Sequence, residues 1–382
     1  MLPREFNRLF KSEENGFLGE LNLSKSDKSE LEEARKVIRD ALKVCLRAFA
    51  KTQGFSLEPR FMSQGSSVYK TQNSPNFAPP QQIDHDLGCY LPFSFLSESG
   101  SPTIAAATFF EVVDRCLGEL VKEKKWKKVV TTKATCARVV INDRLHVDIP
   151  LYSVPDKEMH TILSFAQARG YNTDTFDLGE AYYDADTGWP VLASDQVLLA
   201  HRKEGWKKSD PRKLNAHYVN TLRANETLRR VCRYIKAFRD QLWKEGGPCS
   251  IYLMALCELA IMNLPGHTES DADAFLHVLK TAQGILFGDI RNPTDSQEII
   301  AISKEDRLSL SNACALLARD LETAIHSPEL SDREACTLIA NHLGRRFPVR
   351  DSVPRKETSR VAILSNEPAP SDRRPATRHT SG

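Results

Sequence analysis

The stretch that decides the fold is FMSQGSSVYKTQNSPNFAPPQQIDHDLGCYLP, residues 61–92. It contains a Gly65-Ser66 pair directly after an apolar run, and two carboxylates, Asp84 and Asp86, inside a second apolar run. In a β-strand, residues i and i+2 face the same way. The two aspartates therefore share one face of a predicted strand, which is typical either of a metal site or of a solvated sheet edge.

A third carboxylate lies on a later predicted strand, RLHVDIPLY, residues 144–152. Its apolar residues alternate, so Asp148 lies on the other face together with His146. If the two strands are sheet neighbours, three aspartates converge and suit two Mg²⁺ ions, with Mn²⁺ as an alternative. Two such ions can activate a hydroxyl and stabilise a leaving pyrophosphate. Taken singly, each aspartate is more often a solvated sheet residue, and we expect His85 to be packed rather than a ligand.

The Gly65-Ser66 pair lies where one strand is predicted to end and a short helix to begin. Such a turn offers backbone N–H groups and a hydroxyl to an anion, which suits phosphate. Alone, a Gly-Ser pair is usually an ordinary loop. Gly-Ser, then two aspartates about twenty residues later, then one aspartate on a later strand is a much rarer order. That order resembles the nucleotidyltransferases of the polymerase-beta type.

The whole chain predicts an α+β protein of two lobes with an active-site cleft between them. Residues 1–155 are predicted to form the catalytic core, with a mixed sheet and long helices over 24–52 and 102–124. Residues 156–349 are predicted to be a mainly helical second lobe, with a short helix over 194–204. Residues 350–382 are rich in proline and charge, which predicts a disordered tail.

Composition excludes several classes of protein. The formal net charge of +2 gives no general bias toward nucleic acid. The basic run at 121–129 fits a nucleic-acid patch or the charged end of a helix with Trp126 packed, and we favour the second. Nine scattered cysteines without a C-x-x-C pair predict reduced thiols and no structural zinc. Without a signal peptide or an apolar run of about 18–20 residues, we expect a cytoplasmic protein without membrane contact.

Longer sequence segments around these motifs closely resemble the bacterial cGAS/DncV-like nucleotidyltransferases, the DncV-like branch in particular. These segments are PRFMSQGSSVYKTQN, IDHDLGCYLP, HVDIPLYSVP, SDPRKLNAHYV and LRRVCRYIKAFRDQLWKEGGPCSIYLMA. The likeness runs from FLGELNLSKSDK to about residue 264. One departure is Leu87, where the family often has an acidic residue.

The resemblance implies roles for particular residues. Asp84 and Asp86 would hold both Mg²⁺ ions, and Asp148 would complete the second metal site and help to deprotonate the attacking 3′-hydroxyl. The donor triphosphate would be held by Gln64, Gly65 and Ser66, with Tyr69 beside it.

Further residues match nucleotide contacts of the family. Lys236 and Ser250 stand where relatives contact the donor phosphates, and Arg138, with Thr135 as a weaker match, where they touch nucleotide. The residues alone leave other interpretations open. Lys236 would then be on a solvated helix face, Ser250 a helix N-cap and Arg138 a sheet-surface residue.

The resemblance also implies an activity. Such enzymes make cyclic oligonucleotide messengers for anti-phage signalling systems (CBASS), in which the product activates an effector. We therefore expect 3′,3′-cyclic GMP–AMP synthesis from ATP and GTP, without activation by DNA. Gly382 would be the point at which an E1/E2-like protein conjugates the enzyme. The alternatives are a different cyclic di- or trinucleotide, a nucleotidyltransferase acting on a macromolecule, and a non-catalytic scaffold.

Overall fold

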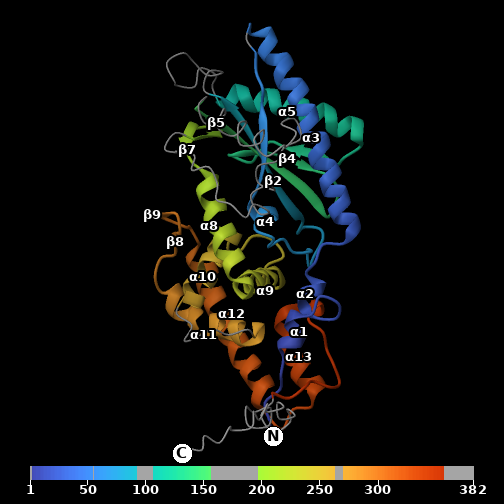
Figure 1. Ribbon diagram of the computed structural model, residues 1–382, viewed down its shortest axis with the longest axis vertical. Coiled ribbons are helices and arrows are strands. Elements are labelled where there is room, and N and C mark those ends of the chain that lie inside the picture. The colour runs from blue at the N-terminus through green and yellow to red at the C-terminus, as the bar shows by residue number, and fades with distance from the viewer. Residues whose placement is uncertain (1, 55, 93–105, 156–196, 263–269, 357–382) are drawn as a thin grey trace, which may run out of the picture.

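The computed structural model describes residues 2–54, 56–92, 106–155, 197–262 and 270–356. They form two lobes stacked along the long axis of the molecule, one built on a β-sheet and the other on helices (Figure 1). Each lobe has its own core of buried apolar side chains. The expected α+β architecture with a mixed sheet and a helical second lobe is confirmed.

A seven-stranded sheet forms the first lobe. Its main path runs β1–β2–β5–β4–β3, and β6 and β7 continue from β5. β2 and β5 are parallel, whereas the other pairs in this sheet are antiparallel. The strands are β1 (Arg60–Gln64), β2 (Ile83–Pro92), β3 (Lys128–Val130), β4 (Cys136–Val140), β5 (Leu145–Val154), β6 (Leu198–His201) and β7 (Gly205–Lys208).

Two long helices share the core of the sheet: α3 (Lys25–Thr52) and α5 (Ala106–Lys124). The Ser24 hydroxyl caps α3 by accepting from the backbone N–H of Asp27. Both helices place apolar residues on one stripe, as their sequence spacing predicts. After α5 ends, Trp126 packs against the same core, which agrees with the interpretation of the basic run as a helix end.

The expectation of free thiols throughout is wrong for one pair. Cys45 of α3 and Cys116 of α5 form a disulfide, with Cα atoms 6.4 Å apart. The sequence does not reveal this pairing, because the two residues are 71 positions apart and meet only when the helices pack. The other seven cysteines are free.

The second lobe contains the predicted helices and some additions. Serine N-caps begin several of them, and Ser270, Ser303 and Ser331 each accept from a backbone N–H three residues on. The helices are α8 (Pro211–Ala224), α9 (Glu226–Leu242), α10 (Ser250–Met262), α11 (Asp271–Leu286), α12 (Lys304–His326) and α13 (Asp332–Leu343), followed by a 3₁₀ turn (Gly344–Arg346). A hairpin of β8 (Arg291–Asn292) and β9 (Asp295–Ile299) lies between α11 and α12.

The start of the chain packs in the helical lobe, and residues 198–208 join the sheet, so the observed lobes differ from the predicted boundaries. The N-terminal helices α1 (Asn7–Lys11) and α2 (Phe17–Glu20) belong to the helical core, where Phe10 and Phe17 pack against Tyr234. The short helix expected over 194–204 is wrong, because β6 lies in the described part of that segment and joins the sheet, with β7 directly after it. Strand pairing and the burial of Ala200 prevail there over a weak helical pattern.

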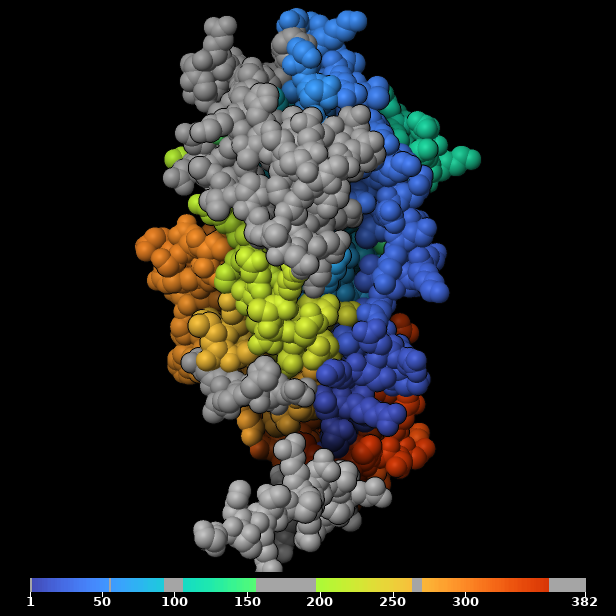
Figure 2. Space-filling view, viewed as in Figure 1, coloured from blue at the N-terminus to red at the C-terminus, as the bar shows by residue number. Residues whose placement is uncertain are grey.

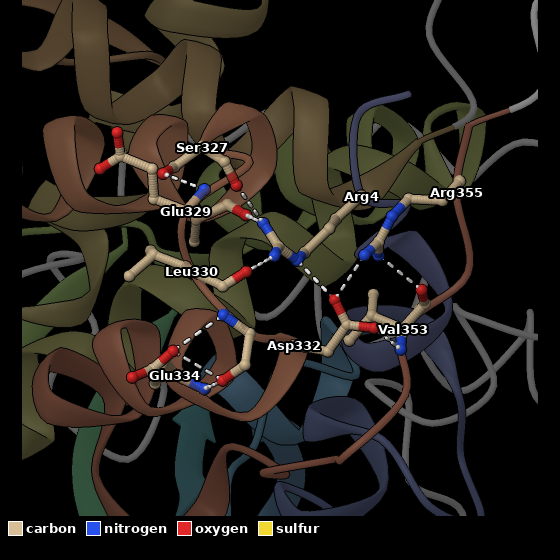
Figure 3. Close-up of polar contacts among 10 residues, drawn as sticks. Arg4, Ser327, Glu329, Leu330, Asp332, Glu334, Val353 and Arg355 are labelled. Atoms are coloured by element: carbon tan, nitrogen blue, oxygen red, sulfur yellow. Dashed lines mark hydrogen bonds and ion pairs between the residues drawn. The ribbon is translucent and has the colours of Figure 1, made fainter. Parts of the chain in front are cut away.

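The start of the chain and residues 350–356 are packed together, so this part of the predicted tail is ordered. Figure 2 shows the dark-blue N-terminal residues beside the red residues near the end of the described chain. The Arg4 side chain is 2% exposed. Its guanidinium donates to Asp332 and to the carbonyls of Ala324, Ser327 and Leu330. Arg355 donates to the same Asp332 carboxylate (Figure 3).

In the described part of the chain, none of the helices combines the length and the apolar character that a bilayer crossing requires.

Candidate active site

The parallel pairing of β2 with β5 builds the centre of the site. Its register places Asp84 beside His146 and Asp86 beside Asp148. The predicted neighbourhood of the two strands is therefore confirmed. Alternation along both strands puts these four side chains on the face opposite the apolar core residues.

The tightest group of metal-ligating atoms differs from the predicted one. Among the described residues, Asp84, His146 and Asp148 each offer one ligand atom, and these atoms lie within 4.8 Å of one another. Asp86 is outside this group because its carboxylate lies against Gly65. A Cβ atom at residue 65 would collide with that carboxylate, and the backbone there has a φ of +65°. Only glycine thus lets β1 turn into the short helix α4 (Gly65–Val68) beside Asp86.

The two carboxylates of β2 have opposite electrostatic environments. Burial disfavours the charge of Asp84, but His146 and Arg138 outweigh burial and lower its pKa. Burial, followed by repulsion from Asp84 and Asp148, raises the pKa of Asp86 well above its ordinary value. A carboxylate cluster of this kind gains most from a nearby cation.

Arg138 supplies one such charge. It lies on β4 and donates to both oxygens of Asp148, at 2.6 and 2.7 Å. Bidentate pairs of this type are strong and directional. Arg138 also lines the cleft described below. The interpretation of Arg138 as a plain sheet-surface residue is therefore wrong, and its guanidinium can serve a carboxylate or an incoming phosphate.

The side chains present fit a divalent cation. Asp84 Oδ1 and His146 Nε2 form an ion pair at 2.9 Å, and neither buried atom has a further hydrogen-bond partner within the described residues. Buried polar atoms without a partner are costly unless something satisfies them. Carboxylate oxygens suit Mg²⁺ or Mn²⁺, and an imidazole nitrogen beside them suits Mn²⁺ better than Mg²⁺.

A cleft of about 780 Å³ opens beside this cluster, between the two lobes. Sheet-lobe residues and residues of α9 and α10 line it together. Five of the predicted site residues line it, namely Ser66, Asp84, Arg138, Lys236 and Ser250. Residues predicted from the sequence thus line both walls of the cleft, although they are far apart in the chain.

The helical wall is electropositive. Lys236 is 5% exposed, and its Nζ donates to the carbonyl of Thr71 at 2.7 Å. The interpretation of Lys236 as part of a solvated helix face is thus wrong. Burial, with Arg239 nearby, lowers the pKa of Lys236 to about 8. Ser250 is the first residue of α10, so the N-terminal end of that helix borders the same cleft.

Other predicted contacts are less direct. The Gln64 amide is held by the hydroxyls of Tyr90 and Tyr152, so only its backbone is available to a phosphate. Tyr69 is buried and packs against Tyr218, with ring centroids 5.4 Å apart. Thr135 is exposed in the loop before β4. Gly382 lies outside the described residues.

Sequence reasoning missed two residues of the site. His146 was visible on the same strand as Asp148, but only the register with β2 shows that it lies beside Asp84. Asn215 lies on α8, within SDPRKLNAHYV, and was given no role from the sequence, although its Oδ1 accepts from the backbone N–H of Gly65 at 3.3 Å. His85 was assessed correctly, since it is buried and contacts Ser63.

Comparisons with known proteins agree with this geometry. Residues 59–152 match the family described as the nucleotidyltransferase domain of cyclic GMP-AMP synthase DncV-like proteins. Residues 225–355 match the C-terminal domain of cyclic GMP-AMP synthase. The first match contains the aspartates of β2 and β5, and the second contains Lys236 and Ser250.

Curated relatives that match this chain are named cyclic GMP-AMP synthase. A cyclic GMP-AMP synthase of Vibrio cholerae serotype O1 is 32% identical over 245 residues, which are 60% of this chain and 53% of that protein. The chain thus spans about half the length of this relative. Another cyclic GMP-AMP synthase, from Escherichia coli, is 26% identical over 351 residues, or 78% of this chain and 80% of that protein.

Solved structures show the same fold. The crystal structure of Vibrio cholerae DncV with a linear intermediate, 5′ pppA(3′,5′)pG, superposes with a TM-score of 0.77 at 23% identity. The superposition covers 94% of this chain and 100% of that one. A DncV mutant bound to ATP, GTP and 5MTHFGLU2 gives a TM-score of 0.77 at 24% identity, over 91% and 97% of the two chains. With both lobes matched in order, the chain belongs to the DncV-like family of cGAS-type nucleotidyltransferases.

Proposed function

We propose that the protein joins ATP and GTP into a cyclic dinucleotide, 3′,3′-cyclic GMP–AMP, with release of pyrophosphate. The observation that carries the proposal is the cleft itself. Its sheet wall holds the acidic cluster around Asp84, and its helical wall holds Lys236 and the start of α10. A triphosphate lying across the cleft would meet positive groups at one end and the acidic cluster at the other.

The chain's own residues account for binding and orientation. Lys236 and the N-terminal end of α10 favour the phosphates of the donor nucleotide. Ser66, beside the turn at Gly65, offers a hydroxyl from the opposite wall. Asp148 is the carboxylate we assign to take the proton of the attacking 3′-hydroxyl. Two divalent cations, when bound, would supply neutralisation of the charge that develops on the transferring phosphate.

Cyclisation needs two transfers in the same cleft. The first would give a linear dinucleotide triphosphate, and the second would close the ring after that intermediate has turned around. The relative whose structure contains a linear pppA(3′,5′)pG supports this order for the family. The cleft volume of about 780 Å³ falls within the range of small-molecule sites, which supports a soluble product.

The proposed role in the cell is anti-phage signalling, in which the cyclic product activates an effector protein. This part rests on the family resemblance. A test is to express the active protein and its Asp84→Asn variant with the genes that neighbour it and to count phage plaques. Protection that needs both the aspartate and an effector supports the role, and equal protection by the variant contradicts it.

The chemistry is tested by incubating the protein with ATP, GTP and Mg²⁺, with label on the α-phosphates. We expect pyrophosphate release and a soluble label that phosphatase cannot remove, because a ring has no terminal phosphate. Label that precipitates with added RNA or protein would instead identify a transferase acting on a macromolecule. The Asp84→Asn variant is the control for contaminating activity.

A further inference from the structure

His146 is the residue of the acidic cluster that the predicted chemistry does not use. It lies on β5, two residues before Asp148, and faces the cleft. Parallel pairing puts it directly beside Asp84. Its side chain is 8% exposed, so the imidazole is held in place rather than mobile at the surface.

His146 has fewer hydrogen-bond partners than a buried histidine usually has. Its Nε2 lies 2.9 Å from Asp84 Oδ1 as an ion pair, and beyond that contact neither atom, nor the Nδ1 of His146, has a hydrogen-bond partner among the described residues. Buried histidines normally satisfy at least one ring nitrogen. Here the nitrogen and the oxygen contact only each other, side by side in a cleft.

Asp148 differs from this pair because both of its oxygens already accept from Arg138. A cation approaching the cluster must compete with that guanidinium for Asp148. It meets no such competitor at Asp84 Oδ1 or His146 Nε2. These two atoms are therefore the first ligands available on the protein.

We propose that His146 is a nitrogen ligand of the divalent cation held by Asp84, and that it biases the site toward Mn²⁺ over Mg²⁺. Imidazole is a poor ligand for Mg²⁺, which prefers oxygen, and binds the transition-metal ions more readily. The inference rests on the proposed nucleotidyl transfer for the identity of the site, but its test does not depend on product formation.

The test is pulsed electron paramagnetic resonance of Mn²⁺ bound to the full chain, with a non-hydrolysable ATP analogue present. We expect a hyperfine coupling from a directly bound ¹⁴N nucleus in the wild type. The coupling should disappear in His146→Gln, which keeps a hydrogen-bond donor and offers oxygen instead of nitrogen. The matched control is His85→Gln on the neighbouring strand, where the histidine contacts Ser63 and should leave the signal unchanged.

A competition titration gives the second readout. The ratio of Mn²⁺ to Mg²⁺ affinity should fall by about tenfold in His146→Gln, because one nitrogen ligand is lost while the carboxylates remain. An equal loss for both metals would show that His146 only orients Asp84, and it would overturn the proposal. So would a wild-type spectrum without nitrogen coupling, or a wild type that binds no Mn²⁺.

Failure of this inference is distinguishable from failure of the proposed function. Cyclic product without nitrogen coupling would refute the ligand and leave the function intact. Nitrogen coupling without any nucleotide product would keep the ligand and refute the function. Thermal unfolding of each variant shows that the fold survives the substitution.

Discussion

At the scale of single residues, the site combines groups whose charges the fold shifts in opposite directions. Asp84 is favoured as a carboxylate, Asp86 is disfavoured, and Lys236 is a buried amine. Perturbed groups gathered in one cleft are typical of functional sites. Residue types and spacing were enough to predict the aspartates and Gly65-Ser66. His146 could not be predicted in the same way, because its role depends on the register between two strands.

In the absence of metal, the Asp86 carboxylate should lower the free energy of unfolding at neutral pH. Its pKa is raised in the folded state, so the unfolded chain binds fewer protons and stability falls as pH rises above the ordinary value of 3.8. Asp86→Asn should therefore unfold at a higher temperature than the wild type at pH 7 in EDTA, and should make no product.

The gain should shrink as the pH falls toward 3.8, because below that value the wild-type carboxyl is protonated in both states. Thermal unfolding at several pH values checks this prediction. Asp295→Asn on the exposed β9 strand is the control. A lower unfolding temperature for Asp86→Asn at pH 7, or a difference that does not change with pH, would contradict the electrostatic argument.

Lys236 should limit activity at alkaline pH. The lowered pKa of about 8 means that the free enzyme loses this positive charge above that pH. We expect kcat/KM for the donor nucleotide to fall above about pH 8, since kcat/KM reports groups of the free enzyme.

Lys236→Gln should lower kcat/KM at pH 7 and flatten the alkaline fall. Lys244→Gln changes an exposed lysine that lines the same cleft and should affect kcat/KM less. An unchanged pH profile in Lys236→Gln would show that another group titrates.

At the scale of elements, the long periodic helices were predictable and the short sheet additions were not. α3, α9, α11, α12 and α13 have clear apolar spacing and polar caps. β6 and β7 are four residues each, and the pairing of β6 with β5 and of β7 with β6 comes from the tertiary fold rather than from local pattern. The Cys45–Cys116 disulfide likewise depends on how two helices pack.

That disulfide leads to a prediction about redox conditions. Closing a loop between residues 71 positions apart restricts the unfolded chain, so a reducing agent should lower the free energy of unfolding by about 2–4 kcal/mol. Cys45→Ser should unfold like the reduced wild type and should no longer respond to reductant. The measurement is denaturant unfolding with and without reductant. Nine reactive thiols in the unreduced, denatured protein would contradict the pairing.

At the scale of the whole molecule, the first residues of the chain are held in the helical lobe by contacts with residues 324–332 and 353–355. Arg4 and Arg355 both bind Asp332, whose pKa falls to about 2 because these contacts outweigh its burial (Figure 3). The first residues therefore belong to the helical lobe, although the sequence order suggested the sheet lobe. Nothing local in residues 2–11 reveals this, because the partners of Arg4 lie more than 300 positions away and Tyr234, which contacts Phe10, lies 224 positions away.

Arg4→Met should destabilise the helical lobe by about 3–5 kcal/mol, because it leaves Asp332 and three carbonyls short of a donor in a buried setting. Arg333→Met removes an ion pair to Asp351 in which both side chains are mostly exposed, and should cost less than about 1 kcal/mol. Urea unfolding compares the two. Equal losses of unfolding free energy would contradict the prediction, because the buried Arg4 contacts would then stabilise the protein no more than an exposed ion pair does.

The central claim is that the cleft between the lobes makes a cyclic dinucleotide. Its most direct test is mass spectrometry of the phosphatase-resistant products formed from all four ribonucleoside triphosphates with Mg²⁺ or Mn²⁺, for the wild type and Asp84→Asn. We predict the mass of cyclic GMP–AMP in the wild type and no product in the variant. A product that persists in the variant, or label found only on an added macromolecule, would contradict the claim.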